Sequence, residues 1–364
     1  MQLNEVIAFL ESKAPPSLQE DYDNSGLLTG SPEMDVQGIL VCLDSTEEIV
    51  EEAVRLGCNV VVAHHPIVFG GLKRITGKNY VERTVLRAIR EGIALYAIHT
   101  NLDHVHTGVN RRIAEQIGLG GIRILEPRTG QLCKFVVYGP RDVIQPVREA
   151  IFLAGGGQIG AYDECSFMHP GKGSFRASEE AHPVIGARGE RAEPDEYRLE
   201  VLVPRWKVAE VLASARASHS YDEMAYDIYP LENVHQEVGA GMIGELPVPM
   251  RAEAFLHHLK QCMGAQVVRH TRLCREEVRR IAVCGGSGSF LLGKAISQGA
   301  DVLVSADFRY HQFFDADGRI IVADIGHYES ERYTIDLLAG WLSEKFRTFA
   351  THKTGVVTNP VNYL

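Results

Sequence analysis

Residues 59–66 read NVVVAHHP, an apolar run that ends in two adjacent histidines and a proline. Such a run is typical of a strand that is buried on both faces of a sheet. Similar runs recur at 38–43 and 94–98, and amphipathic segments at 47–55 and 81–91 separate them, which predicts helices between parallel strands. The sequence therefore predicts an α/β fold in which polar residues after the strands gather at one sheet edge.

The last third of the chain repeats this pattern. Strand-like runs occur at 279–283, 301–304 and 319–323, and a long helix is expected from about 328 to 346. We therefore expect two similar layered α/β halves that together form one domain.

The middle of the chain, residues 129–235, has a different order of predicted elements: strand, helix, a polar stretch, strand, helix, strand. One more strand in the polar stretch would give the order β-α-β-β-α-β, which predicts a ferredoxin-like α+β insert. Turn-rich segments at 127–130 and 233–244 flank it. The discontinuous domain is accordingly expected at 1–128 plus 236–364.

Composition excludes several classes of protein. The chain has 364 residues with 45% hydrophobic and 23% charged residues and a net charge of −10, so a nucleic-acid partner is not favoured. No apolar stretch approaches the roughly 20 residues that cross a bilayer, and the first ten residues lack the pattern of a secretory signal. We expect a cytoplasmic protein with no membrane partner.

Histidines mark the candidate site. His64 and His65 directly follow the apolar run at 59–63, and Pro66 can end that strand so that both imidazoles reach one place. A single histidine at this position would more often have a structural role. For a pair of histidines after a buried strand, a metal site and a structural role are equally expected.

Two further clusters follow predicted strands. The segment HTNLDHVH (99–106) offers Asp103, whereas its neighbours His104 and His106 are interpreted as parts of a solvated loop. The segment GHYESE (326–331) offers His327 and Glu331, which share one helical face at a spacing of four residues. The helix dipole, which favours acidic residues in the first turn, accounts for Glu329 but not for His327.

These clusters supply three imidazoles and two carboxylates. Five ligands are too many for one open zinc site, and the share of imidazole is wrong for calcium or magnesium. They suit two metal ions about 3.5–4 Å apart, with zinc, iron, manganese and nickel as candidates. The expected ligands are His64, His65, Asp103, His327 and Glu331.

The segment CGGSGSF (284–290) follows a predicted strand and opens a predicted helix. Its backbone amides could hold a phosphate group, but it matches neither a dinucleotide fingerprint nor a Walker sequence. A tight packing turn is the favoured interpretation.

Several motifs resemble one family. DYDNSGLL (21–28), AHHPIVFGGLKRIT (63–76), HTNLDHVHTGVN (99–110), YHQFFDA (310–316) and GHYESE resemble the GTP cyclohydrolase I type 2 homologues, dimetal proteins related to the NGG-interacting factor. The insert resembles the extra domain of the long bacterial members, which is similar to nitrogen-regulatory and divalent-ion-tolerance proteins.

The resemblance implies a ligand assignment and an assembly. His65, Asp103 and Glu331 would hold one metal, and His64 and His327 with Glu331 the other, so that Glu331 bridges the two ions. The family forms ring-shaped homohexamers, which we expect here as well.

The resemblance also implies a function. A metal-activated water would attack the imidazole ring of GTP, or a related heterocycle, and release formate. His99 and His311 are the expected proton-transfer residues. A dimetal phosphoesterase or nuclease, and a non-enzymatic metal-binding regulatory scaffold, remain alternatives at this point.

Overall fold

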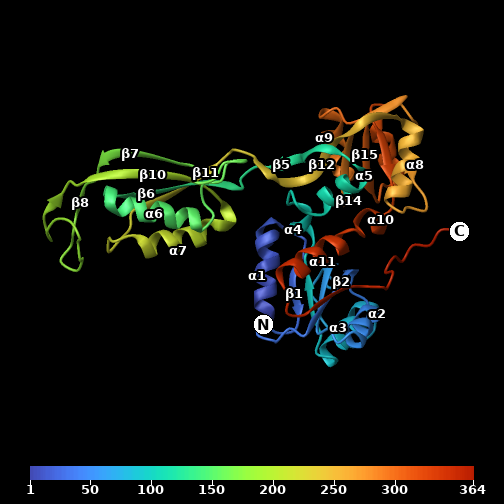
Figure 1. The fold of residues 1–364 in the computed structure, drawn as a ribbon, viewed down its shortest axis with the longest axis horizontal. Helices are drawn as coiled ribbons and strands as arrows, with labels where there is room; N and C mark the ends of the chain where they lie inside the picture. The colour runs from blue at the N-terminus through green and yellow to red at the C-terminus, as the bar shows by residue number, and fades with distance from the viewer. The chain divides into compact units, whose positions relative to one another are not determined.

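The computed structural model describes all 364 residues, which divide into two compact units. Unit 1 consists of Met1–Pro127 and Glu237–Leu364, and unit 2 is Arg128–Gln236. Figure 1 shows several sheets flanked by helices, so the expected α/β class is confirmed. None of the helices combines the length and apolarity that a membrane span needs.

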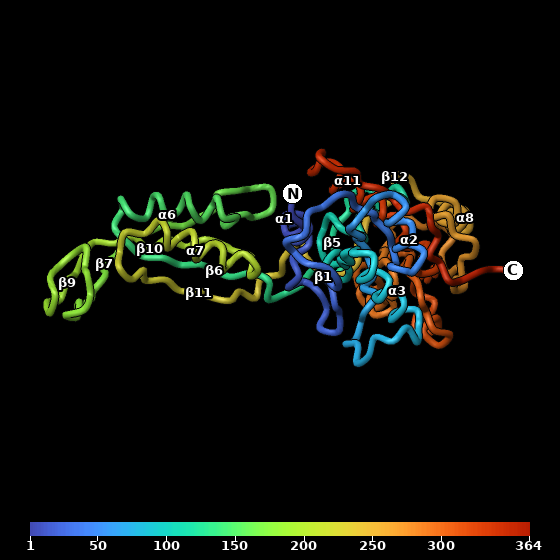
Figure 2. The backbone as a smooth tube through the Cα atoms, turned by 90° about the horizontal axis from the view of Figure 1, so that it is seen from below, coloured from blue at the N-terminus to red at the C-terminus, as the bar shows by residue number.

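The first sheet of unit 1 has five strands, of which β2, β3 and β4 are parallel and almost wholly buried. Helices α2 and α3, seen in Figure 2, contact each other and pack on one face of this sheet, while α11 contacts the other side. Thr46 and Asn79 cap α2 and α3 by accepting hydrogen bonds from backbone amides. In spatial order the strands are β1 (Gly26–Thr29), β4 (Ala94–Ala97), β3 (Val60–His65), β2 (Gly38–Asp44) and β17 (Ala350–Lys353). The helices of this part are α1 (Leu3–Lys13), η1 (Pro16–Leu18), α2 (Glu47–Arg55), α3 (Tyr80–Arg90), α4 (Thr100–Asp103) and α5 (Val109–Ile117).

The second sheet of unit 1 has six strands around a parallel core of β14, β15 and β16. Apolar residues of η3, α9 and η4 pack with one face, and α5, α8 and α10 contact β14. In spatial order its strands are β13 (Arg269–His270), β16 (Ile321–Asp324), β15 (Val302–Ala306), β14 (Glu277–Ser287), β12 (His235–Arg251) and β5 (Gly120–Arg128). The helices are α8 (Ala252–Cys262), η3 (Ser289–Leu291), α9 (Leu292–Ser297), η4 (Tyr310–Ala316), α10 (His327–Glu331) and α11 (Thr334–Lys345).

The expected long helix over 328–346 is wrong, because the structure breaks it into α10 and α11. The break falls at Arg332 and Tyr333, and the Tyr333 hydroxyl donates to the carbonyl oxygen of Cys262 at 2.8 Å. This anchor fixes the break, so α10 presents its side chains to the site while α11 packs along β2 and β17.

The expected turn-rich segment at 233–244 is also different, since most of it lies in the long strand β12. A Cβ atom at Gly239 would lie 2.1 Å from the carbonyl oxygen of Glu126, and one at Gly241 would lie 3.0 Å from that of Val283. The glycines therefore allow close approach of neighbouring backbone rather than a turn.

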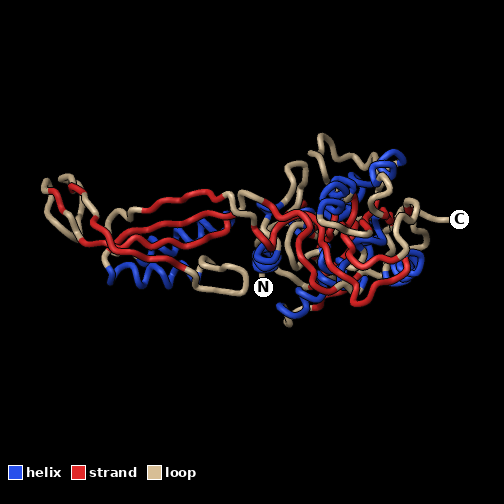
Figure 3. Tube along the Cα trace, turned by 90° about the horizontal axis from the view of Figure 1, so that it is seen from above, coloured by secondary structure: helices blue, strands red, loops and turns tan.

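Unit 2 holds one four-stranded antiparallel sheet in the spatial order β11, β6, β10, β7. Figure 3 shows its strands together with two helices, α6 and α7, which pack on the apolar face of the sheet. The polar stretch contains one further strand of this sheet, β7. The elements are β6 (Leu132–Gly139), α6 (Arg141–Leu153), β7 (Ser166–Lys172), β8 (Phe175–Arg176), β9 (Arg191–Ala192), β10 (Asp195–Pro204), η2 (Arg205–Lys207), α7 (Val208–Ser218) and β11 (Tyr226–Leu231).

Candidate metal centre

The expected metal ligands all lie near the carboxyl ends of strands in unit 1. His64 and His65 end β3, and Asp103 ends the short helix α4 that follows β4. His327 and Glu331 begin and end α10, which follows β16. The fold therefore brings together five side chains from three separate parts of the sequence.

Glu331 lies at the centre of the cluster, and its side chain is only 4% exposed. Its Oε2 lies 2.9 Å from Nε2 of His65 and 3.0 Å from Nε2 of His327. Its Oε1 lies 4.0 Å from Nε2 of His64, which is 3.7 Å from Oδ1 of Asp103. Glu331 therefore joins two groups of ligands, one with His65 and His327 and one with His64 and Asp103.

This grouping differs from the one that the family resemblance implies, in which His65 shares a metal with Asp103 and His64 with His327. The His64 and His65 rings lie 4.9 Å apart, so both histidines reach the cluster at the end of β3. The His65 ring lies 5.2 Å from that of His327, and His64 faces Asp103. The side-chain contacts therefore group His65 with His327 and His64 with Asp103.

In each of the three ligand imidazoles, Nδ1 faces a hydrogen-bond acceptor. Donation from Nδ1–H to that acceptor fixes the ring and leaves the lone pair of Nε2 directed into the cluster, an arrangement typical of histidines that bind metals. The acceptors are the Ile98 carbonyl oxygen for His64 (2.8 Å), Oδ1 of Asp44 for His65 (2.7 Å) and Oδ2 of Asp307 for His327 (2.7 Å).

The three imidazoles differ in how readily they bind a proton. Burial lowers the pKa of His64 to about 3, so this ring is neutral. Burial acts in the same direction on His65, but hydrogen bonds to Asp44 and Glu331 outweigh it and raise its pKa to about 10. In the same way, the carboxylates beside His327 outweigh burial and raise its pKa to about 11.

The two carboxyl groups respond to burial in opposite ways. Burial and the nearby Glu331 carboxylate raise the pKa of Asp103. Burial would also raise the pKa of Glu331, but His327 and His65 hold it well below its usual range. The cluster therefore attracts positive charge, in the form of protons or of a bound cation.

Two buried atoms of the cluster have no hydrogen-bond partner: Nε2 of His64 and Oδ1 of Asp103. Their separation of 3.7 Å is too long for a hydrogen bond between them. Because a buried polar atom without a partner is costly, a cation held between these two atoms would satisfy both. The residues therefore fit a divalent-metal site.

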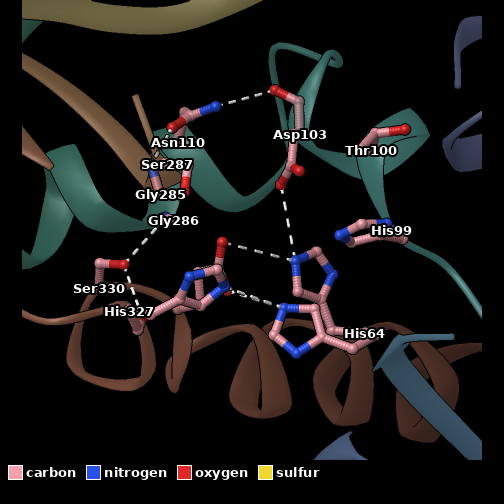
Figure 4. A network of polar contacts seen from close by, with 12 residues as sticks. His64, His99, Thr100, Asp103, Asn110, Gly285, Gly286, Ser287, His327 and Ser330 are labelled. Atoms are coloured by element: carbon pink, nitrogen blue, oxygen red, sulfur yellow. Dashed lines mark hydrogen bonds and ion pairs between the residues drawn. The ribbon is translucent and has the colours of Figure 1, made fainter. Parts of the chain in front are cut away.

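The segment 284–290 packs tightly against the ligands, as Figure 4 shows for Gly285 and Gly286. The Gly286 amide donates to Oγ of Ser330 at 3.0 Å, and the Gly285 amide donates to Oδ1 of Asn110 at 2.8 Å. Gly286 has a φ of 56°, and a Cβ there would lie 2.6 Å from Oε1 of Glu331. The segment therefore packs closely against the ligands as expected, but its residues 284–287 continue strand β14 and do not form a turn.

The two expected proton-transfer residues lie in different places. One ring nitrogen of His99 lies within 4.8 Å of nitrogens of His64 and His65, and its Nδ1 is 2.7 Å from Oδ1 of Asp23. His311 lies exposed on η4, where its ring contacts those of Tyr310 and Phe314. The structure therefore joins His99 to the metal ligands but does not bring His311 to them.

Three residues that orient histidines of the site, directly or through another side chain, are not among the residues predicted from the sequence. Asp307 directly follows the apolar strand β15, which is the same signal that identified His64 and His65. Asp23 lies in a polar loop and accepts from the Thr100 amide at 3.0 Å as well as facing His99. Thr358 lies near the C-terminus, with no signal in the sequence around it.

A cavity of about 770 Å³ opens beside the ligands, and we call it the central cavity. It is lined by the ligands His65, Asp103, His327 and Glu331 and by residues of the C-terminal segment after β17. This volume is in the range of sites for small organic molecules.

Comparison with known proteins identifies relatives of the whole chain. A model of the Duf34/NIF3 (NGG1p interacting factor 3) family matches residues 1–360. A Halalkalibacterium halodurans protein named GTP cyclohydrolase 1 type 2 homolog is 38% identical over 325 residues, covering 88% of this chain and 87% of its own. A Bacillus subtilis protein of the same name is 35% identical over 326 residues, covering 89% and 87%.

Solved structures show the same fold. A Bacillus cereus protein related to NIF3 superimposes with a TM-score of 0.88 at 33% identity, covering 100% of this chain and 99% of its own. A Staphylococcus aureus protein superimposes with a TM-score of 0.78 at 27% identity, with the same coverage.

Proposed function

The chain belongs to the Duf34/NIF3 family, and we propose that it is a dinuclear metal-dependent hydrolase that acts on a nucleotide or a related heterocycle. The observation that carries this proposal is the position of Glu331, whose two carboxylate oxygens face two separate groups of ligands. A carboxylate shared between two sets of ligands suits two metal ions that lie close together.

Each group has a defined set of donors. Nε2 of His65, Nε2 of His327 and Oε2 of Glu331 would hold one ion. Nε2 of His64, Oδ1 of Asp103 and Oε1 of Glu331 would hold the other. Imidazole with carboxylate suits zinc, iron, manganese or nickel. When bound, two such ions supply Lewis acidity and lower the pKa of water.

His99 is the proposed proton-transfer residue of the site. The Asp23 carboxylate, 2.7 Å from Nδ1 of His99, fixes the orientation of the ring. Hydrogen bonds from Thr100 and Ser25 to Oδ2 of Asp23 hold that carboxylate in turn. The ring lines the central cavity, where its other nitrogen can give or accept a proton from a substrate.

The names of the relatives support the heterocycle as substrate class. Hydrolytic opening of an imidazole ring adds one water molecule across a ring carbon and nitrogen and leaves a formamide, and a second water hydrolyses this amide to release formate. The nitrogen leaves as an amine and needs a proton, which His99 is placed to supply.

The test combines metal content with turnover. Protein purified without added metal should contain about two ions per chain by elemental analysis. Metal-dependent release of formate or another ring-opening product should disappear in His64→Ala and Glu331→Gln proteins that stay folded. His169→Ala and Glu344→Gln, at exposed positions away from the ligands, serve as matched controls.

Other outcomes would favour a different function or contradict the proposal. Two ions with hydrolysis of phosphoesters alone would indicate a phosphoesterase instead. Two ions with no turnover of either class would favour a metal-binding scaffold. Wild-type protein that binds no metal even after reconstitution would contradict the proposal. The homohexamer stays a prediction, which sedimentation velocity of the full chain can check.

A further inference from the structure

The central cavity carries a charge pattern that bears on the substrate. We infer that the molecule bound there is a planar heterocycle without phosphate groups, of nucleobase or nucleoside size, rather than a nucleoside triphosphate. The inference rests on the proposed function for the identity of the site, and it is argued from the walls of the cavity.

Carboxylates dominate these walls. Seven carboxylate side chains line the central cavity, against one guanidinium, that of Arg269, and no lysine. Arg269 is already engaged, because it forms an ion pair with Asp324 and also donates to the carbonyl oxygen of Phe308 at 3.2 Å. The charge of the one arginine in the wall is therefore already paired, and no lysine is present to bind a phosphate.

Metal ions would not reverse this balance. Four of the seven carboxylates belong to the metal centre, either as ligands or as partners of the ligand histidines. They are Asp44, Asp103, Asp307 and Glu331. Two divalent ions would match these four negative charges, so the loaded centre would have no net positive charge with which to attract an anion.

The remaining charge of the wall is negative. Glu329, only 5% exposed, lies on α10 and accepts a hydrogen bond of 3.0 Å from Nδ2 of Asn359. Glu20 also lines the cavity, where Oε1 lies 2.7 Å from Nε2 of His104. A triphosphate placed here would meet like charge, which costs binding energy.

The glycine-rich segment 284–290 does not provide an alternative phosphate site. Its amides at Gly285, Gly286 and Gly288 donate to Asn110, Ser330 and Ser305, respectively. A phosphate cradle needs several free backbone amides that point at the ligand. Here three of them are used within the protein.

Aromatic side chains, in contrast, are abundant at the cavity. Six of its lining residues are aromatic, and several are unusually exposed for their size. Phe69 is 52% exposed, Tyr80 61% and Phe290 65%. The Phe69 ring also meets the His99 ring edge to face at 5.6 Å, next to the metal ligands. Exposed rings of this kind are typical platforms on which flat heterocycles stack.

The binding experiment compares guanosine, GTP and inorganic triphosphate on metal-loaded full-length protein by calorimetry. Guanosine should bind at least about tenfold more tightly than GTP, the factor that corresponds to about 1.4 kcal/mol. Inorganic triphosphate should bind no more tightly than GTP. Phe69→Ala and Phe290→Ala should each weaken guanosine binding about tenfold. Calorimetry measures binding and does not depend on turnover. A failure of the hydrolase proposal would therefore appear in the turnover assay and not in this experiment.

A charge-addition variant sharpens the test. Val361→Lys places a cation at a lining residue that is 52% exposed, and it should tighten GTP binding while leaving guanosine binding unchanged. Val357→Lys, 72% exposed in the same segment but outside the cavity lining, is the matched control and should change neither affinity.

Three results would overturn the inference. One is GTP binding as tight as guanosine binding or tighter. Another is a loss of GTP affinity in the Lys73→Ala, Arg74→Ala double variant, because these exposed cations follow Phe69 in the chain and could bind phosphates outside the cavity. The third is failure of every nucleobase and nucleoside in a purine, pyrimidine and pteridine panel to bind.

Discussion

The hydroxyl group of Thr358 donates a hydrogen bond of 2.6 Å to Oδ2 of Asp44, whose Oδ1 lies 2.7 Å from Nδ1 of His65. Burial acts to raise the pKa of Asp44, but the hydrogen bonds from His65 and Thr358 outweigh it and hold the pKa below its usual range. The segment after β17 therefore helps to orient a metal ligand that lies almost three hundred residues earlier in the chain.

Two substitutions that disrupt these contacts should weaken metal binding to different degrees. Asp44→Asn should reduce metal affinity about 10- to 100-fold, because it removes the negative charge of the group that accepts from His65 and orients its ring. Thr358→Val removes one neutral hydrogen bond, worth about 1 kcal/mol, and should reduce affinity only a few-fold. Titration with a competing chelator measures both. Thr348→Val, at an exposed position, is the control, and equal losses in all three proteins would contradict the assigned roles.

Asp307 offers a second test, on the other group of ligands. Its φ of 57° lies in the left-handed region, which asparagine tolerates as well as aspartate, so Asp307→Asn should keep the backbone intact. We expect about 10- to 100-fold weaker binding of one of the two ions, because His327 loses its charged partner. Asp317→Asn is the matched control: its φ is 47°, its side chain is exposed, and it should leave both ions in place.

Gly286→Ala should damage the metal centre directly. The new Cβ would lie 2.6 Å from Oε1 of Glu331 and 3.1 Å from Cε1 of His327, so the ligands would have to move. The left-handed backbone adds about 1–2 kcal/mol of strain. Gly121→Ala has a similar φ of 60° with no atom within 4 Å, and it isolates the strain from the clash. Elemental analysis should show metal loss in Gly286→Ala but not in Gly121→Ala. Normal metal content in Gly286→Ala would contradict the predicted clash with the ligands.

Stability at low pH should depend on Glu82. Hydrogen bonds from the backbone of Lys78 and Thr76, and from the Thr76 hydroxyl, lower the pKa of Glu82 to about 2. Because the folded pKa is depressed from 4.5, this stabilisation is present above about pH 4.5 and is lost as the pH falls toward 2. Glu82→Gln should lower the urea midpoint at pH 6 more than at pH 3. Glu253→Gln, on the exposed side of α8, should show no such difference, and an unchanged midpoint of Glu82→Gln at pH 6 would contradict the role.

The parts of the site that could be predicted share one property: they follow apolar strands in the sequence. His64, His65 and His327 come within a few residues of buried runs, and parallel strands place their carboxyl ends at one edge. Asp307 carries the same signal after β15, but a single aspartate is common in loops and does not by itself indicate a site. The α/β class followed from the same runs.

Other features depend on contacts that no local pattern encodes. Thr358 meets Asp44 through tertiary structure alone, and nothing in the surrounding sequence marks it. The pairing of His65 with His327 depends on where tertiary structure places α10 relative to the end of β3. The break between α10 and α11 depends on the anchor of Tyr333 at Cys262, which comes from a distant helix.

Removal of metal should destabilise the protein through the same buried atoms. Without a cation, His64 Nε2 and Asp103 Oδ1 remain buried without partners, and the Asp103 and Glu331 carboxyl groups lie close together. A metal present at 100 times its dissociation constant stabilises the folded state by about 2.7 kcal/mol, so excess chelator should lower the unfolding temperature by several degrees. Calorimetry of wild-type protein before and after chelation measures the shift, and added metal should restore it. In His64→Ala the shift should be much smaller, because one group of ligands is incomplete. A shift of equal size in the two proteins would place the stabilising ion elsewhere in the chain.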